Sequence, residues 1–134
     1  MNSFVVRLKK GDLLKESILK VCIDNNIKAG VVTSSVGSLV KTRIRNAGAT
    51  RIEELNRDLE IVSINGTVSM NRIHLHICVS DSDLRTYGGH LEKGSVVNST
   101  CELVILELSE YEFDKVYDEE TGYNELLIKE GKEN

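Results

Sequence analysis

The sequence predicts an α+β fold with many strands and one main helix. Three observations support it: one segment near the N-terminus has apolar residues at helical spacing, several later segments are β-branched or alternate in polarity, and turn residues separate them. With 134 residues and 40% hydrophobic content, the chain has room for one core. We therefore expect a single domain over residues 1–134, with a core of about 3–128 and a frayed tail at 129–134.

The N-terminal region predicts a strand followed by the helix. Residues 3–8 are apolar and β-branched, and Gly11-Asp12 then opens the helix with Asp12 as its N-cap. Asn25-Asn26 ends the helix, because Asn tolerates the left-handed backbone conformation. The buried stripe, in which we expect the cysteine to act as a small core residue, consists of Leu14, Ile18, Val21 and Cys22.

The middle of the chain changes to strand patterning. Residues 29–46 read as one long or bent strand, with a bend or bulge at Gly37. Residues 47–58 are polar and typical of turns, although residues 51–60 can also form a short helical piece.

The next strand, at residues 59–70, leaves two alternatives open. It turns as a hairpin at Asn65-Gly66, or it continues through Gly66 as a bulge and turns at Met70-Asn71. In both alternatives, the next strand has strictly alternating apolar and polar side chains.

The C-terminal half contains that alternating strand, a loop and a central strand. Residues 72–80 place apolar side chains on one face and polar ones on the other. Residues 81–95 are a polar loop with three glycines, and residues 100–109 are apolar throughout, which indicates a central strand. The acidic end, residues 111–130, predicts a short strand, a turn at Thr121-Gly122 and a last apolar piece.

Charge and cysteine content limit the possible partners and compartment. Residues 107–134 hold ten acidic and three basic side chains, whereas residues 1–106 hold eleven acidic and fourteen basic ones. The net charge of −4 argues against a general phosphate-binding surface, and the few aromatic residues argue against base stacking. No stretch approaches the ~18 apolar residues of a membrane span. Three widely spaced cysteines predict no disulfide framework, so we expect a reducing cytoplasm.

The three histidines of the chain lie between positions 74 and 90. His74 and His76 are two residues apart on a predicted strand, so both rings project from one face within ~7 Å. His90 follows Gly88-Gly89, a pair that lets the backbone turn a third imidazole toward the other two. Three imidazoles are the ligand set of an open zinc site, with water or substrate in the fourth position. The alternative is a solvated strand face for the first two and a loop position for the third.

Other polar side chains within strands are candidates for the same chemistry. Cys78 lies on the histidine face and is either a fourth soft ligand or a buried bystander. Glu60 and Glu102 are carboxylates inside apolar strands, so each is an acid–base group, an acceptor for a histidine N–H, or an exposed edge residue. Lys41, Arg43 and Arg45 alternate along one strand and form a basic face. We expect this face to be solvated, in preference to contacting a phosphate or a carboxylate substrate.

The pairing of HLHICVS at residues 74–80 with YGGHL at residues 87–91 resembles the PPC domain, the plants and prokaryotes conserved domain. Further matching positions, in chain order, are Arg7, Gly11-Asp12, Val36-Gly37-Ser38, Glu60, Gly66, Thr121-Gly122-Tyr123 and Leu126. The resemblance implies a strongly bent mixed β-sheet with one main helix packed on it, related to the acetolactate decarboxylase fold, and a homotrimer. It also implies that the metal-site residues are His74, His76 and His90.

Plant members of the family are fused to AT-hooks that hold DNA, and stand-alone prokaryotic members inherit the description of DNA-binding proteins. A proline-free sequence cannot contain the Arg-Gly-Arg-Pro core of such a hook. The resemblance therefore implies a domain of assembly and protein contacts more directly than a DNA-binding one.

Three functions follow as hypotheses. The first is a homotrimeric module that binds zinc or another divalent metal and is described by its family as DNA-binding or regulatory. The second is a metal-dependent lyase or hydrolase, in which Glu60 or Glu102 handles protons and Arg85 holds a small carboxylated substrate. The third is sequence-nonspecific DNA binding through the basic strand face.

Overall fold

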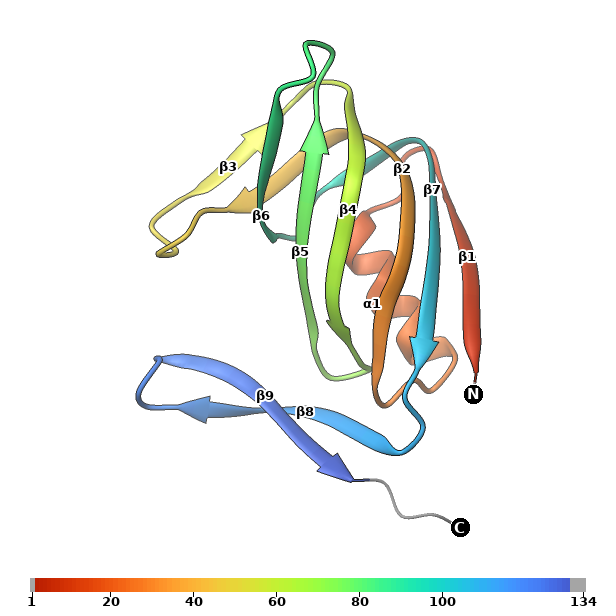
Figure 1. The fold of residues 1–134 in the computed structure, drawn as a ribbon, viewed down its shortest axis with the longest axis vertical. Coiled ribbons are helices and arrows are strands. Elements are labelled where there is room, and N and C mark those ends of the chain that lie inside the picture. Colours follow the sequence, from red (N-terminus) through yellow and green to blue (C-terminus); the bar gives the residue numbers. More distant parts are fainter. Residues whose placement is uncertain (1, 131–134) are drawn as a thin grey trace.

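The computed structural model describes residues 2–130, and it shows a β-rich fold with one helix (Figure 1). The helix is α1 (Leu14–Asp24). The main sheet is formed by β1 (Ser3–Lys9), β2 (Gly30–Arg45), β3 (Ile52–Leu55), β4 (Leu59–Val68), β5 (Ile73–Ser80), β6 (Thr86–Leu91) and β7 (Val96–Glu107). A separate two-stranded sheet is formed by β8 (Tyr111–Asp118) and β9 (Tyr123–Glu130).

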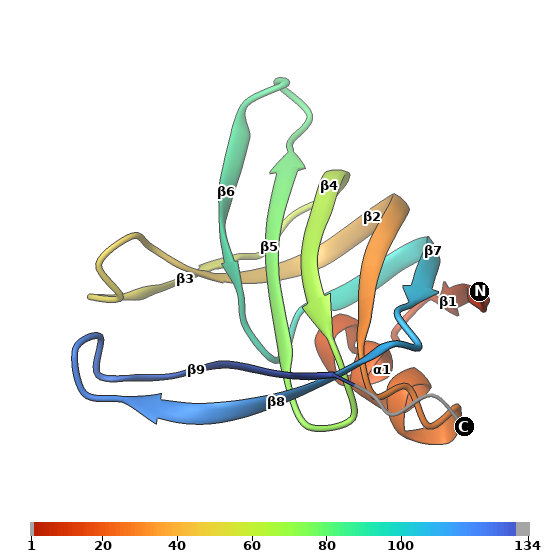
Figure 2. The same ribbon diagram turned by 60° about the horizontal axis from the view of Figure 1, so that its bottom comes forward.

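The main sheet curls until its last strand returns to its longest one. Its order is β1-β7-β2-β4-β5-β6, and β6 also pairs with the C-terminal end of β2 through Ile44↔Leu91 and Arg45↔His90. The strong bend that this closure requires is visible in Figure 2. Every pairing between the described strands is antiparallel, so the mixed sheet that the resemblance implied is replaced by an antiparallel one.

Strand β2 bends at the glycine that the sequence singled out. Gly37 has φ +152°, and the β2–β7 register shifts between Gly37 and Leu39. A Cβ at this position would lie 2.0 Å from the carbonyl oxygen of Thr100. Glycine is therefore required where β7 crosses closely over the bend.

Strand β4 runs through Gly66 and turns only at residues 69–72, which decides between the two alternatives. Gly66 pairs with Leu75, and a Cβ there would lie 2.0 Å from the carbonyl oxygen of His74. The register shift of this pair lies between Ile61 and Ser63, so Gly66 permits close strand approach without being a bulge.

The helix begins differently from the prediction. Its N-cap residue is Leu13, which has no side-chain cap, whereas the Asp12 carboxylate accepts a hydrogen bond from the Lys9 backbone N–H at 2.8 Å. Asp12 thus tightens the turn before the helix and does not cap it. The helix end agrees with expectation, because Asn26 follows it with φ +53°.

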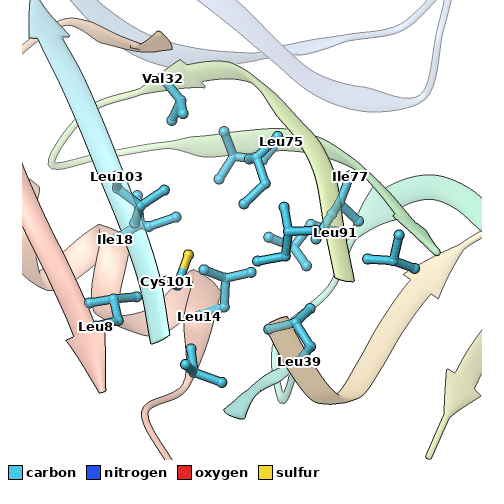
Figure 3. Close-up of a cluster of buried hydrophobic side chains, with 14 of the residues drawn as sticks. Leu8, Leu14, Ile18, Val32, Leu39, Leu75, Ile77, Leu91, Cys101 and Leu103 are labelled. Carbon is cyan, nitrogen blue, oxygen red and sulfur yellow. The ribbon is translucent and has the colours of Figure 1, made fainter. Parts of the chain in front are cut away.

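The core lies between α1 and the curled sheet. Leu14, Ile18 and Cys22 of the helix are fully buried, and Figure 3 shows Leu14 and Ile18 among side chains of the facing strands. Fully buried partners from the sheet include Leu75 and Leu103. Each such side chain contributes about 1.5–3 kcal/mol through removal from water.

Two segments are strands where the sequence predicted otherwise. Residues 52–55 form β3 on β2, where Leu55 is buried, so the short helical piece is wrong. Residues 86–91 form β6 within the predicted polar loop, because they pair with β5 on one side and with the end of β2 on the other. Tertiary pairing overrides the turn signal of Gly88-Gly89.

The β8–β9 hairpin extends away from the body, as Figures 1 and 2 both show. Phe113 anchors it: its side chain is buried, its N–H donates to the Lys28 carbonyl, and its carbonyl accepts from the Ser69 hydroxyl. Of the expected frayed tail, residues 129–130 complete β9, and residues 131–134 lie outside the described residues. Within residues 2–130, α1 is far too short to be a membrane-spanning helix.

Candidate metal centre

The three histidines lie on two neighbouring strands of the sheet. His74 and His76 are on β5, and His90 on β6 pairs directly with His76. Residues opposite one another in an antiparallel pair project from the same face, as do residues two apart on one strand. All three rings therefore share one face, opposite the buried face of Leu75 and Ile77.

The rings converge closely enough to hold one ion. Their centroids lie 5.2–5.8 Å apart, and one nitrogen from each histidine lies within 4.8 Å of the others. In a tetrahedral zinc site with Zn–N bonds of about 2.0–2.1 Å, ligand nitrogens are roughly 3.4 Å apart. Small side-chain rotations close the remaining gap.

Two of the three histidines favour the neutral form. Burial, with the nearby charges of Arg45 and Lys15, lowers the pKa of His90 from 6.5 to about 4. Burial and Arg72 also lower the pKa of His74. Neutral imidazole is the form that binds a metal.

One ring nitrogen shows directly that a partner is missing from the chain's own hydrogen bonds. His90 Nδ1 is buried and, among the described residues, has no hydrogen-bond partner. A buried, unpartnered nitrogen on a ring that lies beside two other imidazoles suits a metal ion, which needs a lone pair and no hydrogen. The three histidines therefore fit a divalent transition metal.

Two charged residues flank this cluster. Arg72 Nη2 donates to His74 Nδ1 at 3.2 Å, so the chain already uses that nitrogen. Glu92 Oε1 lies 3.9 Å from His90 Nε2, where a small rotation lets it accept the N–H of a metal-bound ring. Both residues are missed by the sequence reasoning, although each lies two positions from a histidine and so shares its strand face.

The cluster lies between two hollows of the surface. The larger, of about 700 Å³, is lined by His74 and His90, by α1, by the turn before β5 and by the β8–β9 hairpin. The smaller, of about 580 Å³, is lined by His76, His90 and the chain after β2. Cys78 is not in the three-histidine group among the described residues, so a tetrahedral ion held there would have a fourth position for water or a ligand.

The proposed acid–base and substrate-holding residues lie elsewhere. Glu60 is exposed and pairs with Ser80 at the far end of β5, and Glu102 is exposed on β7 opposite Arg7. Arg85 is exposed in the β5–β6 turn, roughly 15 Å along the hairpin from the His76↔His90 pair at about 3.3 Å per residue. None of these three joins the histidines.

The basic strand face is largely compensated by carboxylates. Lys41 and Arg43 lie 4.0 and 3.5 Å from Glu54 of β3, and Arg45 lies 3.8 Å from Glu92. The sequence favoured a solvated face here, and the side chains of Lys41 and Arg43 are 40% and 36% exposed. Arg45 is different, because its pairing with His90 carries it to the metal centre.

The fold and the site together define a small antiparallel β-protein with an open three-histidine cluster. The family model of the Plants and Prokaryotes Conserved (PCC) domain matches residues 1–109. The chain belongs to this family, as the pairing of the two histidine motifs predicted.

Several known proteins are similar to this chain. It is 36% identical over 126 residues to the bifunctional protein GlmU of a Synechococcus strain, with 94% of this chain but 20% of that protein covered. The chain thus spans about a fifth of the length of the curated relatives that it matches. A hypothetical protein from Salmonella enterica is 32% identical with a TM-score of 0.93, covering 96% of this chain and 94% of that one.

Three further solved structures are similar to this chain. A metal-containing protein from Archaeoglobus fulgidus is 29% identical with a TM-score of 0.81, covering 95% of this chain and 94% of that one. Two structures described as proposed DNA-binding proteins, from Bacteroides thetaiotaomicron and Ralstonia eutropha, are each 22% identical, with TM-scores of 0.84 and 0.77. They cover 93% and 91% of this chain, and their likeness is one of fold alone.

Proposed function

We propose that this protein is a metal-binding PPC-domain module that holds one divalent transition metal, zinc in the first instance, on His74, His76 and His90. The observation that carries the proposal is the convergence of three imidazoles within 4.8 Å, one of them with a buried, unpartnered nitrogen. The similar protein from Archaeoglobus fulgidus is described as metal-containing, which supports it further. Three nitrogen ligands suit zinc, and also nickel or iron, so the metal itself has to be measured.

Elemental analysis of the purified protein tests this proposal. We expect about one metal ion per chain in the wild type and a small residual fraction in His74→Ala, because one of three ligands is lost. Cys78→Ser is the matched control, since Cys78 lies on the same strand face but outside the cluster, and it should keep its metal. Equal metal content in the wild type and His74→Ala would refute the site.

The second candidate function is that of a metal-dependent lyase or hydrolase. The family resemblance implies a fold related to that of acetolactate decarboxylase, which belongs to this candidate. The open coordination position beside a hollow supports it, because substrate can reach the ion there. The carboxylates near the histidines are Glu92 and Glu125, which would replace Glu60 and Glu102 as acid–base groups. The test is to incubate the zinc-loaded protein with small carboxylated compounds and measure product release. We expect the Glu92→Gln variant to lose this activity.

The module acts, in this proposal, as a homotrimer. The β8–β9 hairpin exposes large apolar side chains that a partner chain can cover: Val116, Tyr117, Tyr123 and Ile128 are 47–62% exposed. Light scattering during size-exclusion chromatography should give a mass near 45 kDa, three times the 14.9 kDa of one chain. Tyr117→Glu should lower that mass, and a monomeric wild type would refute assembly.

Duplex DNA is the remaining candidate partner, because two structures of this fold carry that description. The ion pairs of Lys41 and Arg43 with Glu54 leave that strand face little free positive charge for phosphates. A mobility-shift assay at low salt decides the matter, and the absence of a shift with any duplex excludes DNA.

The cysteines at 22, 78 and 101 are free, which supports the proposed cytoplasmic location.

A further inference from the structure

The larger hollow beside the histidines has an unusual balance of charge. Its lining has two acidic residues, Glu16 and Glu125, against five basic ones: Lys15, Arg45, Arg72, Lys93 and Lys115. The chain as a whole has a net charge of −4. Positive charge therefore predominates in this hollow, although the protein as a whole is acidic.

Most of these cations lack an anionic partner. Within residues 2–130, only Arg45 of the five lies within 4 Å of a carboxylate oxygen, at 3.8 Å from Glu92. The Lys15 ammonium donates to the Leu91 carbonyl at 3.3 Å, and Arg72 donates to His74. The Glu16 carboxylate is occupied by the backbone N–H of Gly94 at 3.1 Å.

The hollow also desolvates part of this charge. Burial, with the neighbouring charges of Lys93 and Arg45, lowers the pKa of Lys15 against the opposing effect of Glu92 and Glu16. The Nε atom of Arg45 is buried and has no hydrogen-bond partner among the described residues. Partly desolvated cations that outnumber the nearby carboxylates are costly unless an anion occupies the space between them.

The size of the hollow indicates what kind of anion fits. A volume of about 700 Å³ lies within the range of small-molecule pockets. We propose that this hollow binds a small molecule carrying at least two negative charges on phosphate or carboxylate oxygens, with its inner end facing His74 and His90. The ligand class thus deepens the proposed metal-binding function, since the same oxygens can enter the open position of the ion.

The binding residues come from distant parts of the chain. Lys15 lies on α1, Arg72 in the turn before β5, and Lys115 on β8 of the projecting hairpin. A ligand that contacts all three joins the hairpin to the body through charge. Tyr123 already reaches across, with the Arg45 guanidinium 5.8 Å from its ring centroid.

Calorimetric titration of metal-free protein with pyrophosphate and, separately, with citrate tests the proposal without chelation of the metal. We expect saturable one-to-one binding, weakened about 10-fold in Arg72→Ala and about 5-fold in Lys115→Gln, since charge-assisted bonds are lost. The matched controls are Arg51→Ala and Lys129→Gln, whose side chains are 69% and 49% exposed outside the hollow. The controls should stay within twofold of the wild type.

The outcomes separate this proposal from the metal site. His76→Ala removes a metal ligand that does not line this hollow, so it should lose metal yet bind pyrophosphate in the metal-free state as the wild type does. Absence of saturable binding of both anions to wild type, with metal still bound, overturns the anion site alone. Equal weakening in the control variants, or preferential one-to-one binding of a DNA duplex that Arg72→Ala abolishes, also overturns it.

Discussion

The two ends of the β5–β6 hairpin carry polar side chains in opposite states. At one end, three histidines face one another, and His90 Nδ1 has no partner among the described residues. At the other end, the Asp81 carboxylate accepts from the backbone N–H groups of Asp83 and Arg85 at 3.0 Å and from the Tyr87 hydroxyl at 3.3 Å. The Asp81 carboxylate is fully hydrogen-bonded within the chain and stabilises a turn. His90 Nδ1 has no hydrogen-bond partner among the described residues, which suits a site for a ligand.

The largest effect on this comparison should come from Gly66→Ala. The added Cβ would lie 2.0 Å from the carbonyl oxygen of His74, so β4 or β5 must move at the histidine end. We expect a loss of about 3 kcal/mol in the free energy of unfolding. Urea denaturation measures it, with Gly48→Ala as the control: its φ is +85° but nothing lies within 4 Å, so only about 1 kcal/mol should be lost. Equal losses would mean that close strand approach is unimportant here.

Glu92→Gln should weaken metal binding without affecting the Asp81 end. A carboxylate that accepts the N–H of a metal-bound imidazole orients the ring, and removal of such a partner costs about 10-fold in affinity. Glu92 lies 3.9 Å from His90 Nε2, close enough to take this part after a small rotation. Competition against a chromophoric chelator measures the change. Glu53→Gln, at an exposed position paired with Arg51, is the control. An unchanged affinity would show that Glu92 plays no part in holding the ligand ring.

Arg72→Ala should act in the opposite direction on the metal. It removes both a positive charge beside a bound dication and a donor that competes for His74 Nδ1, so affinity should rise about threefold. The same chelator competition detects it, with Arg51→Ala for comparison. Tighter metal combined with weaker pyrophosphate binding is a pattern that general misfolding would not produce.

The smallest effect should come from Asp81→Asn at the satisfied end. Burial opposes ionisation of Asp81, but hydrogen bonds from Arg85, Asp83 and Tyr87, with the charge of Arg57, outweigh it and hold the pKa below its ordinary value of 3.8. The ionised form therefore stabilises the fold above that pH, and this stabilisation is lost as pH falls through the lowered pKa. Calorimetry should show a Tm a few degrees below wild type at pH 7, with a smaller difference at pH 3. Asp83→Asn should match the wild type, and a pH-independent difference would contradict the charge-based explanation.

The sequence predicted the parts of the site that depend on local alternation. Strict polarity alternation placed His74 and His76 on one face of β5, opposite Leu75 and Ile77, and the structure agrees. The helix stripe was equally local, since burial follows its 3.6-residue period.

The parts that failed depend on distant strands. Gly88-Gly89 signals a turn by itself, but a Cβ at Gly89 would lie 2.7 Å from the carbonyl oxygen of Arg45, so the glycine serves the closure of β6 onto β2. The basic hollow was equally hidden, because Lys15 and Lys115 are one hundred residues apart and no short-range pattern joins them. Glu60 and Glu102 were chosen for being polar within apolar strands, which an exposed strand face explains equally well.

The closure of β6 onto β2 is only two residue pairs long, Ile44↔Leu91 and Arg45↔His90, and beside it the Glu92 N–H donates to the Arg43 carbonyl. Such a short contact opens locally far more often than the long β2–β7 ladder. Its amide protons should exchange with deuterium before those of β7. His90 stays paired with His76 across the longer β5–β6 ladder, so each opening of this seam moves Arg45 away from the metal centre while the three ligands stay together.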